Sequence, residues 1–452
     1  MGGIVNKRRI YALCEIAPEV RAVAFAKCSR SPEQIDKIAK ELDEDKSRKF
    51  HEKWVVGYGH SSVAEHAVLS IAMENISILA TKAVEDARLA SYTEKSTRYQ
   101  VFDKDKYYKP ELGELNWLYQ ETCDFLFSKY NELMPLVIGF FKKKFPDEKE
   151  MEIKNRALDC LRYILPASTL TTLGMTINSR ALEHSISKLL THPLAEMQEI
   201  GKEMKESALK ITPTLIKYAN KNNYLSETIG SLRESSPRIL KASKINNKEG
   251  AALVEYDKDA ENKIVSALLY RFSGLSYEQI KEHVKNMGAS EKEKIIGNAL
   301  SRLSKFDRPL REFEHIYYTF DVLMDYGGFR DVQRHRMCTQ TNQEFSAEQG
   351  YQIPNEITEA GFERDFKECM EKAKKGYAEI KNKFPYESQY IIPMAFNKRV
   401  LITMNLRELF HFIKLRSGKG SHISYKKIAQ QMHSEIKKVH PIMARYIECN
   451  IG

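Results

Sequence analysis

Three cationic or titratable side chains stand in a row in the second half of the chain: Arg334, His335 and Arg336. Crowded positive charges repel one another, so a run of this kind favours a bound anion. Arginine presents a planar fork of donors that suits phosphates, and it stays charged at any relevant pH. The run therefore indicates an anion site, although a solvated basic helix end is the simpler interpretation of these three residues alone.

A second candidate anion site lies far upstream, in the segment SYTEKSTRY. Ser96 and Arg98 are two residues apart, so in an extended loop their side chains point to one face and can share one phosphate. The alternative is a surface turn whose charge is incidental.

Length and composition restrict the class of protein. The chain has 452 residues, of which 42% are apolar, so two domains with cores of their own are expected. The net charge of +10 suits a protein that handles anions such as nucleotides. It is weaker than the dense basic stripe of a dedicated nucleic-acid binder, and we expect neither a nucleic-acid nor a membrane partner. Seven cysteines without a CxxC pair, and no apolar signal core at the start, predict a cytoplasmic protein.

The chain repeats itself. Glu65-His66 and Glu314-His315 each precede an alternating stretch and a segment that ends in basic residues. Four further pairs share one common spacing: Pro166 with Pro393, Asn178 with Asn405, Arg180 with Arg407, and His184 with His411. The Glu-His pairs are spaced more widely, so the first copy carries extra residues. We predict a tandem duplication of two long units rather than a short-period solenoid.

The predicted organisation follows from this repeat. The first domain covers 1–225, a polar linker covers 226–250, and the second domain covers 251–452. An extra helical insert at about 103–150 holds one or two amphipathic helices within 116–145. Candidate strands lie at 8–16, 251–257 and 316–322, the last with Ile316, Tyr318, Phe320 and Val322 on one face. The predicted class is helix-rich α+β, with a small antiparallel sheet in each copy.

These motifs together resemble one known family. GHSSVAEH (59–66), the Arg-His-Arg run, the Ser-x-Arg-Tyr segment and the Asn-x-Arg-x-Leu helices are similar to those of the flavin-dependent thymidylate synthases. The chain looks like two such subunits fused head to tail. The resemblance implies FAD as cofactor, NADPH and methylenetetrahydrofolate as co-substrates, and reductive methylation of dUMP to dTMP. It also implies four assembled subunits whose sites form where subunits meet.

The resemblance also implies roles for particular residues. Arg416 would face the uracil and promote ionisation at N3, and we take Arg416 and His335 as catalytic. No metal is expected. The cofactor-binding set is Arg334, His335, Arg336, His60, Ser62, Glu65, Glu94, Asn178, Arg180, Asn405, Arg407 and His411. The substrate-binding set is Arg88, Ser91, Ser96, Arg98, Tyr99, Arg162 and Arg416. An ordinary helix N-terminal turn remains the alternative for Asn178-x-Arg180 and Asn405-x-Arg407.

Neither copy keeps all the motif residues, and each copy retains residues that the other has lost. The first copy has Asp86-Ala87-Arg88 in place of Arg-His-Arg, and Leu189 at the position of Arg416. The second copy has Glu348 at the position of Arg98, where it would repel a phosphate, and Gln389 at the position of Arg162. It also has Pro309 and Arg311 at the positions of His60 and Ser62. We infer a composite site in which each copy supplies what the other lacks. A homodimer would then mimic the family's tetramer with two competent sites.

Two other functions remain open. A divergent flavin-binding relative could act on another pyrimidine nucleotide. A protein that keeps the fold could bind nucleotides or RNA without catalysis, although the modest charge and the lack of interleaved aromatic and basic runs argue against an RNA platform.

Overall fold

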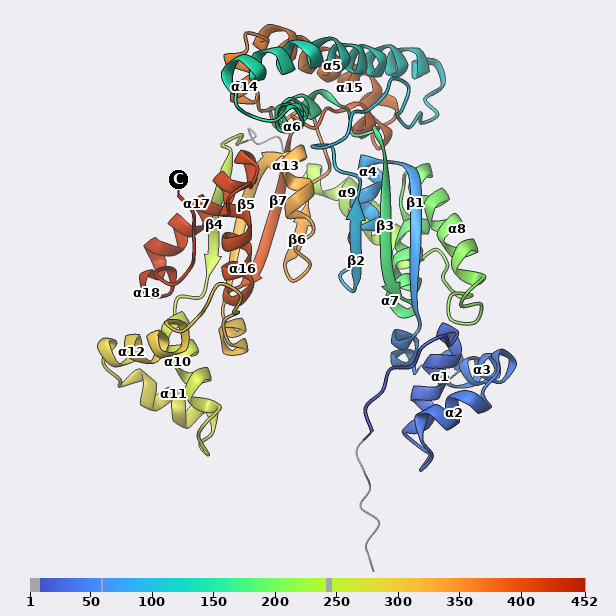
Figure 1. Cartoon of the computed structure of the whole chain (residues 1–452), viewed down its shortest axis with the longest axis vertical. Helices are drawn as coiled ribbons and strands as arrows, with labels where there is room; N and C mark the ends of the chain where they lie inside the picture. Colours follow the sequence, from blue (N-terminus) through green and yellow to red (C-terminus); the bar gives the residue numbers. More distant parts are fainter. Residues whose placement is uncertain (1–8, 58–59, 241–245, 452) are drawn as a thin grey trace, which may run out of the picture. The chain divides into compact units, whose positions relative to one another are not determined.

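The computed structural model describes residues 9–57, 60–240 and 246–451, which form two compact units (Figure 1). Unit 1 contains the chain up to Ile76, Ala83–Lys95 and Thr171–Ala242. Unit 2 contains Ser77–Lys82, Ser96–Leu170 and Ser243–Gly452. The compact units therefore cross the predicted domain boundaries, because two segments of the first copy pack with the second copy. The division into tandem domains at 1–225 and 251–452 stays a prediction.

Unit 1 is built on a three-stranded sheet. Its strand order is β1 (Val68–Ser77), β3 (Leu170–Asn178), β2 (Ala90–Glu94), and β2 and β3 are antiparallel with Ala90 opposite Ile177. Helices α7 (Ser179–Thr191) and α8 (Ala195–Leu209) pack against each other beside this sheet (Figure 1). A separate helical group precedes the sheet: α1 (Pro18–Cys28), α2 (Ile35–Glu41), α3 (Glu44–His51) and a π-helix at Glu52–Gly57.

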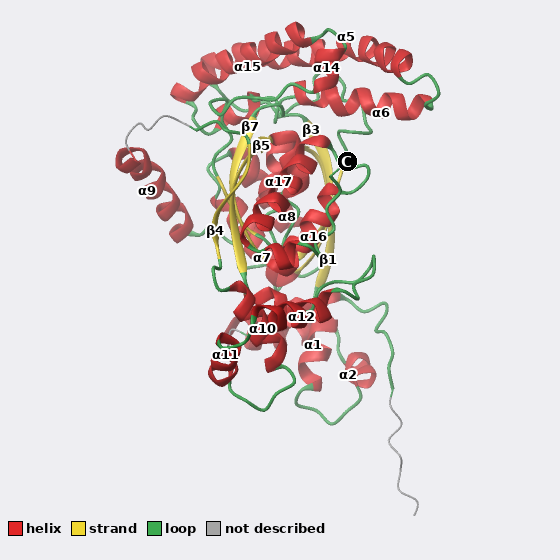
Figure 2. Ribbon diagram, turned by 90° about the vertical axis from the view of Figure 1, so that its left-hand side faces the viewer, coloured by secondary structure: helices red, strands yellow, loops and turns green. Residues whose placement is uncertain are grey.

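Unit 2 is built on a four-stranded antiparallel sheet. Its strand order is β4 (Gly250–Tyr256), β5 (Tyr317–Asp325), β7 (Asn397–Asn405), β6 (Thr339–Asn342). Helices α16 (Leu406–Ser417) and α17 (Ile423–Val439) pack together and contact the sheet (Figure 2). The remaining helices of the second copy include α10 (Ala260–Tyr270), α11 (Tyr277–Lys285), α12 (Ala289–Leu300), α13 (Tyr326–Val332) and α18 (Pro441–Ala444).

The predicted inner face of β5 is confirmed. Tyr318, Phe320 and Val322 are completely buried, as is Ile316 just before the strand. On the other face Tyr317 is 53% exposed, but Thr319 and Leu323 are buried as well, so most of β5 is covered on both faces.

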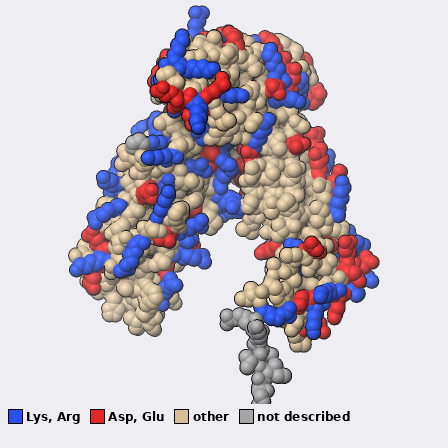
Figure 3. All heavy atoms as spheres, viewed as in Figure 1, with Lys and Arg blue, Asp and Glu red and all other residues tan. Residues whose placement is uncertain are grey.

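Two long helices of unit 2 lie side by side, α5 (Asn116–Lys144) and α15 (Glu363–Lys383), with α6 (Glu150–Leu161) and α14 (Asn355–Glu359) next to them (Figure 1). The amphipathic helix expected within 116–145 is confirmed as the single helix α5. It has a counterpart in position, because α15 lies between β6 and β7 as α5 lies between β2 and β3. Lysines and glutamates are mixed over these helices (Figure 3), and several form ion pairs across them: Lys144–Glu359, Lys372–Glu121, Lys383–Glu114 and Lys129–Asp365.

Equivalent contacts recur in the two copies, as expected of a duplication. The hydroxyls of Ser70 and Thr176 lie 2.9 Å apart across β1 and β3, and those of Thr319 and Thr403 lie 2.9 Å apart across β5 and β7. Two ion pairs also correspond, Glu65–Arg180 at 2.5 Å and Glu314–Arg407 at 2.9 Å. The same residue types at the same spacing therefore build the same local structure twice.

Within unit 2 the copies meet about a local two-fold axis. Pro166 forms a β-bridge with its own counterpart, Pro393. The flanking hydrogen bonds are reciprocal. Ala167 N–H donates to Ile392 C=O at 2.9 Å, and Met394 N–H donates to Leu165 C=O at 3.0 Å. Such an exchange is the signature of an isologous contact. It brings the residues that precede Pro166, including Arg162, into the same unit as the Arg-His-Arg run.

Two local predictions differ from the structure. The strand predicted at 8–16 is wrong: residues 9–16 form no strand, Glu15 has a left-handed φ of 57°, and α1 begins at Pro18. Residue 8 lies outside the described residues. Much of the predicted irregular linker is the helix α9 (Asn223–Leu240), although none of its described side chains is buried. The helix nevertheless contacts α7. Residues 241–245 lie outside the described part of the chain.

Among the residues that the structure describes, no helix combines the length and apolar character that a membrane crossing requires.

Candidate active site

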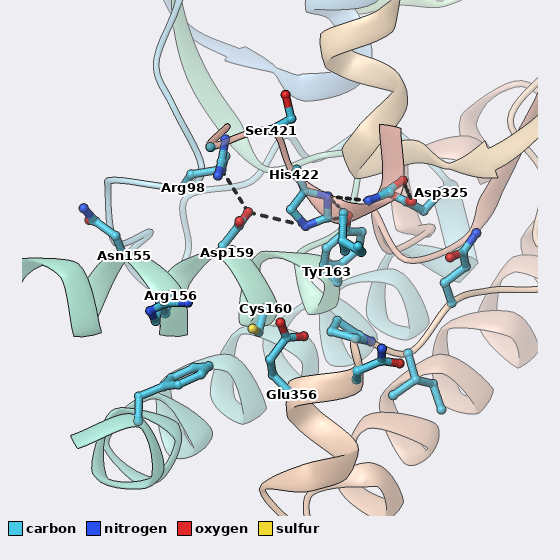
Figure 4. A pocket seen from close by; sticks show the side chains of 18 of the residues that line it. Arg98, Asn155, Arg156, Asp159, Cys160, Tyr163, Asp325, Glu356, Ser421 and His422 are labelled. Carbon is cyan, nitrogen blue, oxygen red and sulfur yellow. Dashed lines mark hydrogen bonds and ion pairs between the residues drawn. The ribbon is translucent and has the colours of Figure 1, made fainter. Parts of the chain in front are cut away.

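Unit 2 contains a cleft of about 900 Å³ that is lined by residues from both copies (Figure 4). The first copy contributes Arg98, Asp159 and Tyr163, and the second copy contributes Asp325, Ser421 and His422. A cleft of this size can hold a nucleotide-sized ligand.

The carboxylate of Asp159 is the centre of this cleft. Its Oδ1 atom lies 3.1 Å from Arg98 Nε, 3.2 Å from Arg162 Nε and 3.7 Å from His422 Nε2. Figure 4 shows Arg98 and His422 both pointing toward Asp159, which projects from α6. Asp159 and Arg162 are three residues apart at the end of this helix, a spacing that places both side chains on one face.

Arg162 is a buried cation. Only 2% of its surface is exposed, and its Nη2 atom has no hydrogen-bond partner among the described residues. Burial opposes the charge, but Tyr163 and Asp159 outweigh it and raise the pKa of Arg162 above its usual value. The same balance, with Asp159 as the main opposing charge, raises the pKa of Arg98. Both guanidiniums are therefore cations that can bind an anion.

The loop that carries Arg98 is held in place from both copies. The Thr97 hydroxyl accepts a hydrogen bond from Arg162 Nη1 at 3.3 Å and another from Arg330 Nη1 at 3.2 Å. Arg330 lies on α13 of the second copy and is buried. Within the loop, Arg98 N–H donates to the Ser96 hydroxyl at 3.2 Å. Tyr99, the last predicted loop residue, is 56% exposed.

The Arg-His-Arg run follows α13 and divides into one buried and two exposed residues. Arg334 and Arg336 are exposed, and Arg334 pairs with Asp331. His335 is 5% exposed. Its Nε2 atom accepts from Arg416 Nε at 2.9 Å, so the ring proton lies on Nδ1, which donates to Glu408 Oε1 at 3.0 Å. Burial lowers the pKa of His335, so this imidazole is neutral.

Arg416 connects this network to Asp331, although neither Arg416 nor His335 is among the residues that line the cleft. It donates to the backbone C=O of Asp331, lies 3.7 Å from the Asp331 carboxylate and stacks 5.2 Å from the Tyr425 ring. Burial lowers the pKa of Arg416 below its usual value, but the group remains a cation. Burial would raise the pKa of Asp331, but Arg334, Arg416 and Arg162 together lower it. Asp331 therefore interacts with the arginines of both copies.

The structure thus brings some predicted residues together and leaves others apart. Arg98 and Arg162 of the first copy lie in one unit with His335 and Arg416 of the second. The residues of unit 1 are not part of this set: His60, Ser62, Glu65, Arg88, Ser91, Glu94, Asn178 and Arg180. Of these, Glu65 and Arg180 form the ion pair described above.

The two predicted asparagines cap helices. The Asn178 side chain accepts from Ala181 N–H at 2.9 Å, and the Asn405 side chain accepts from Glu408 N–H at 2.9 Å. Their amide oxygens are therefore engaged locally, as the helix N-terminal interpretation requires. Each amide nitrogen can still donate to a ligand.

One group of side chains has the composition of a metal site. The ligand atoms of His335, Glu408 and His411 lie within 4.8 Å of one another. However, both ring nitrogens of His335 are engaged, one by Arg416 and one by Glu408. No ring lone pair of His335 remains for a cation, and Arg416 adds a positive charge beside this ring. A hydrogen-bond network explains this group better than a metal centre does.

Sequence reasoning missed several residues of the site. Asp159 and Asp331 each stand three residues before a predicted arginine, and this helical spacing could have indicated them. His422 carried no sequence signal: it caps α17, where its Nδ1 accepts from Ser424 N–H at 3.2 Å. Thr97 and Arg330 act through other side chains, so their contribution depends on the tertiary fold.

Comparison with known proteins gives the family. The model of the family described as "Thymidylate synthase complementing protein" matches residues 13–214 and again residues 252–442. A UPF0159 protein of Chlamydia pneumoniae is 33% identical over 427 residues, which cover 89% of this chain and 80% of that protein. A flavin-dependent thymidylate synthase of Clostridium tetani is 28% identical over 209 residues, which cover 45% of this chain and 82% of that enzyme.

A solved structure of a UMP/dUMP methylase, PolB from Streptomyces cacaoi bound with 5-Br dUMP, is 17% identical in sequence. It covers 45% of this chain and 96% of that chain with a TM-score of 0.35, which is too low to support a conclusion. The two family matches together span most of the sequence and coincide with the repeat seen in the strands, the ion pairs and the Pro166–Pro393 bridge. The chain therefore belongs to the thymidylate synthase complementing protein family, as two tandem copies of its helix-rich α+β fold.

Proposed function

We propose that the chain is an FAD-dependent enzyme that methylates dUMP to dTMP at a composite site. The observation that carries the proposal is the meeting of Arg98 and Arg162 with His335 and Arg416 in one unit, since neither copy holds all four. The relatives that are named flavin-dependent thymidylate synthases support the same reaction. Methylenetetrahydrofolate and NADPH are the proposed co-substrates.

Arg98 and Arg162 would bind the nucleotide phosphate. Both point to one centre, and the buried Nη2 of Arg162 lacks a hydrogen-bond partner among the described residues. A buried donor without a partner is costly, and a ligand oxygen would satisfy it. Arg416 would donate to the pyrimidine carbonyl and stabilise negative charge on the ring. His335, held neutral between Arg416 and Glu408, would fix the orientation of that guanidinium.

The residues after α13 fit an anionic flavin. Arg334 and Arg336 are exposed cations beside a neutral imidazole, and Arg407 adds a further guanidinium on α16. FAD, when bound, supplies the hydride that the reductive methylation needs. The protein's part is to bind the phosphates and to place positive charge beside the ring system.

The predicted residues of unit 1, such as His60 and Ser62, would act at an assembled site. We propose a cytoplasmic homodimer with two working sites, in which the remaining two sites are vestigial or regulatory. This assembly is the one that the family resemblance implies for two fused subunits.

Asp331 favours a second candidate, a different pyrimidine nucleotide as substrate. Its carboxylate lies 3.7 Å from Arg416 Nη1, where it opposes the build-up of negative charge on a uracil ring. A carboxylate is also the natural acceptor for the amino group of cytosine. Binding measurements with dUMP and dCMP compare the two: tighter binding of dCMP would favour the second candidate.

The test is the stoichiometry of FAD and dUMP binding to the purified chain, followed by flavin absorbance and calorimetry. We expect one FAD and one dUMP per chain. Arg98→Ala should abolish dUMP binding, and Arg334→Ala should weaken FAD binding about tenfold or more, the loss of one charge-assisted contact. The matched control is Arg445→Ala, which alters a surface arginine that pairs with Glu293 at 2.7 Å and belongs to neither predicted binding set. Two FAD per chain would contradict a composite site, and no FAD would contradict the proposed reaction.

A further inference from the structure

The phosphate site proposed above already contains an anion. A single carboxylate oxygen, Asp159 Oδ1, lies within 3.2 Å of the Nε atoms of both Arg98 and Arg162. Asp159 lines the cleft and its side chain is 19% exposed, whereas the Oδ1 atom itself is buried, so a ligand can take its place only when the carboxylate turns away. A phosphate oxygen bound to the Nε atoms of both arginines would take the position that this oxygen occupies. The two anions cannot share the site, because like charges at contact distance repel strongly.

The carboxylate has another partner within reach. His422 Nδ1 accepts from Ser424 N–H, a group that can only donate, so the ring proton lies on Nε2. That atom is 3.7 Å from Asp159 Oδ1, slightly beyond hydrogen-bond length. A small rotation of the carboxylate would bring the two groups into contact.

The surroundings of His422 keep it neutral while the site is empty. Burial is the largest cause, and with Arg162 and Arg98 it lowers the pKa of His422 to about 4, although Asp159 and Asp325 oppose this change. Tyr163 lies against the ring with its hydroxyl 3.4 Å from the ring nitrogens. An anion beside Arg98 and Arg162, together with closer contact to Asp159, would reverse this balance.

We propose that Asp159 is a place-holding anion: it neutralises Arg98 and Arg162 in the empty site and turns to His422 when a phosphomonoester replaces it, and His422 then takes up one proton from solvent. The inference rests on the proposed role of the two arginines in binding the nucleotide phosphate. It makes Asp159 and His422 positioning residues that couple ligand binding to protonation. The buried arginines consequently keep a counter-ion in both states, whereas an empty site without Asp159 would leave them unpaired.

Calorimetry of dUMP binding near neutral pH, in two buffers of different ionisation enthalpy, counts the protons exchanged. The phosphate of dUMP titrates near neutral pH itself, so the informative quantity is the difference between the wild-type chain and His422→Gln. We expect the wild-type chain to take up more protons than the variant, by up to about one per dUMP. Glutamine keeps a side-chain acceptor that can cap α17. Equal proton uptake in the two proteins would overturn the proposal.

Asp159→Asn tests the place-holder directly. Removing the competing charge should tighten dUMP about tenfold, the equivalent of one pKa unit, and leave deoxyuridine binding unchanged. Weaker or unchanged dUMP binding by this variant would overturn the inference while leaving the proposed function intact. If Asp159→Asn does not fold, the proton count with His422→Gln decides the matter.

If dUMP does not bind, inorganic phosphate tests the place-holding role of Asp159 separately from the proposed substrate. In that case the proposed substrate is wrong, and the melting temperature in phosphate becomes the readout. A larger rise for Asp159→Asn than for the wild-type chain would uphold the place-holder. An equal or smaller rise would overturn it.

Discussion

Two loops of unit 2 have the same turn but opposite charges. In the first, the Ser96 hydroxyl accepts from Arg98 N–H at 3.2 Å, and in the second, the Ser346 hydroxyl accepts from Glu348 N–H at 3.0 Å. Arg98 faces Asp159, whereas Glu348 pairs with Lys381 on α15. The serine therefore sets the backbone, and the residue two positions later sets what the loop can bind. Duplication preserved the turn and reversed its charge.

The side chains that hold the two loops in place also differ in charge. Arg162 donates to the Thr97 hydroxyl of the first loop at 3.3 Å, and its counterpart Gln389 accepts from Phe345 N–H of the second at 3.1 Å. A neutral amide holds its loop without any counter-ion. The buried guanidinium needs Asp159 or a bound anion, so the charge is retained only at the loop that can bind a phosphate.

The largest expected effect comes from replacing Arg162, which holds the first loop, with glutamine, the residue type that holds the second loop. Arg162→Gln would leave Asp159 with one close arginine instead of two and remove a donor to Thr97. We expect about 3 kcal/mol of lost stability, at the lower end of the cost of breaking a buried ion pair, and loss of dUMP binding. Urea unfolding and calorimetry measure the two effects.

The matched control for this variant is Arg156→Gln on the same helix. Arg156 pairs with Glu148 at 2.6 Å at the surface, where an ion pair contributes at most about 1 kcal/mol. If Arg162→Gln and Arg156→Gln lost equal stability, the buried charge of Arg162 would contribute no more to folding than a surface ion pair does.

Exchanging the loop charges should affect ligand binding more than folding. Arg98→Glu copies the second loop into the first and should weaken dUMP at least about hundredfold, roughly 2.7 kcal/mol. Glu348→Arg makes the reverse change and should leave dUMP binding at the first loop as it is. Calorimetry with both variants checks this, and circular dichroism shows whether each variant keeps its overall fold. A loss of binding in Glu348→Arg would mean that the second loop also contacts the nucleotide.

His422 should make the stability of unit 2 depend on pH. Its pKa is lowered from 6.5 to about 4 in the folded chain, so the unfolded chain takes up the proton first as the pH falls. The stabilisation is complete above about pH 6.5 and is lost progressively toward about pH 4. Between about pH 7.5 and about pH 5 the loss should be about 2 kcal/mol for this residue. His422→Gln should remove that part of the dependence, which urea unfolding at the two pH values measures; an unchanged slope would contradict it.

The repeat and its motifs could be predicted from the sequence because they rest on residue identity. The strand at 317–325 and the long helix at 116–144 follow from spacing and periodicity. The complementary losses in the two copies likewise led to the proposal of a composite site. These features can be predicted because each depends on which residue type stands at a given position.

The remaining features of the fold and of the site depend on which distant segments of the chain pack together. Nothing local indicates that 96–170 packs with the second copy, because the Pro166–Pro393 bridge uses backbone groups that every residue has. For the same reason His422 could not be assigned to the cleft. The wrong strand prediction at 8–16 shows that a strand-like segment can also mislead, since it does not form a sheet without a partner strand.

The smallest expected effect concerns the contact that the two copies share most closely. Arg407 pairs with Glu314 at 2.9 Å and also donates to Pro309 C=O at 2.7 Å, whereas within the described part of the chain Arg180 pairs only with Glu65. The Arg407 side chain is 31% exposed and that of Arg180 is 50% exposed. Arg407→Ala should therefore cost about 1 kcal/mol and Arg180→Ala about 0.3 kcal/mol, the range of partly and fully solvated pairs. Double-mutant cycles with Glu314→Ala and Glu65→Ala measure each coupling, and high salt should weaken the Arg180 pair more. If the Arg180 pair proved the stronger, solvent exposure would not be what distinguishes the two copies at this contact.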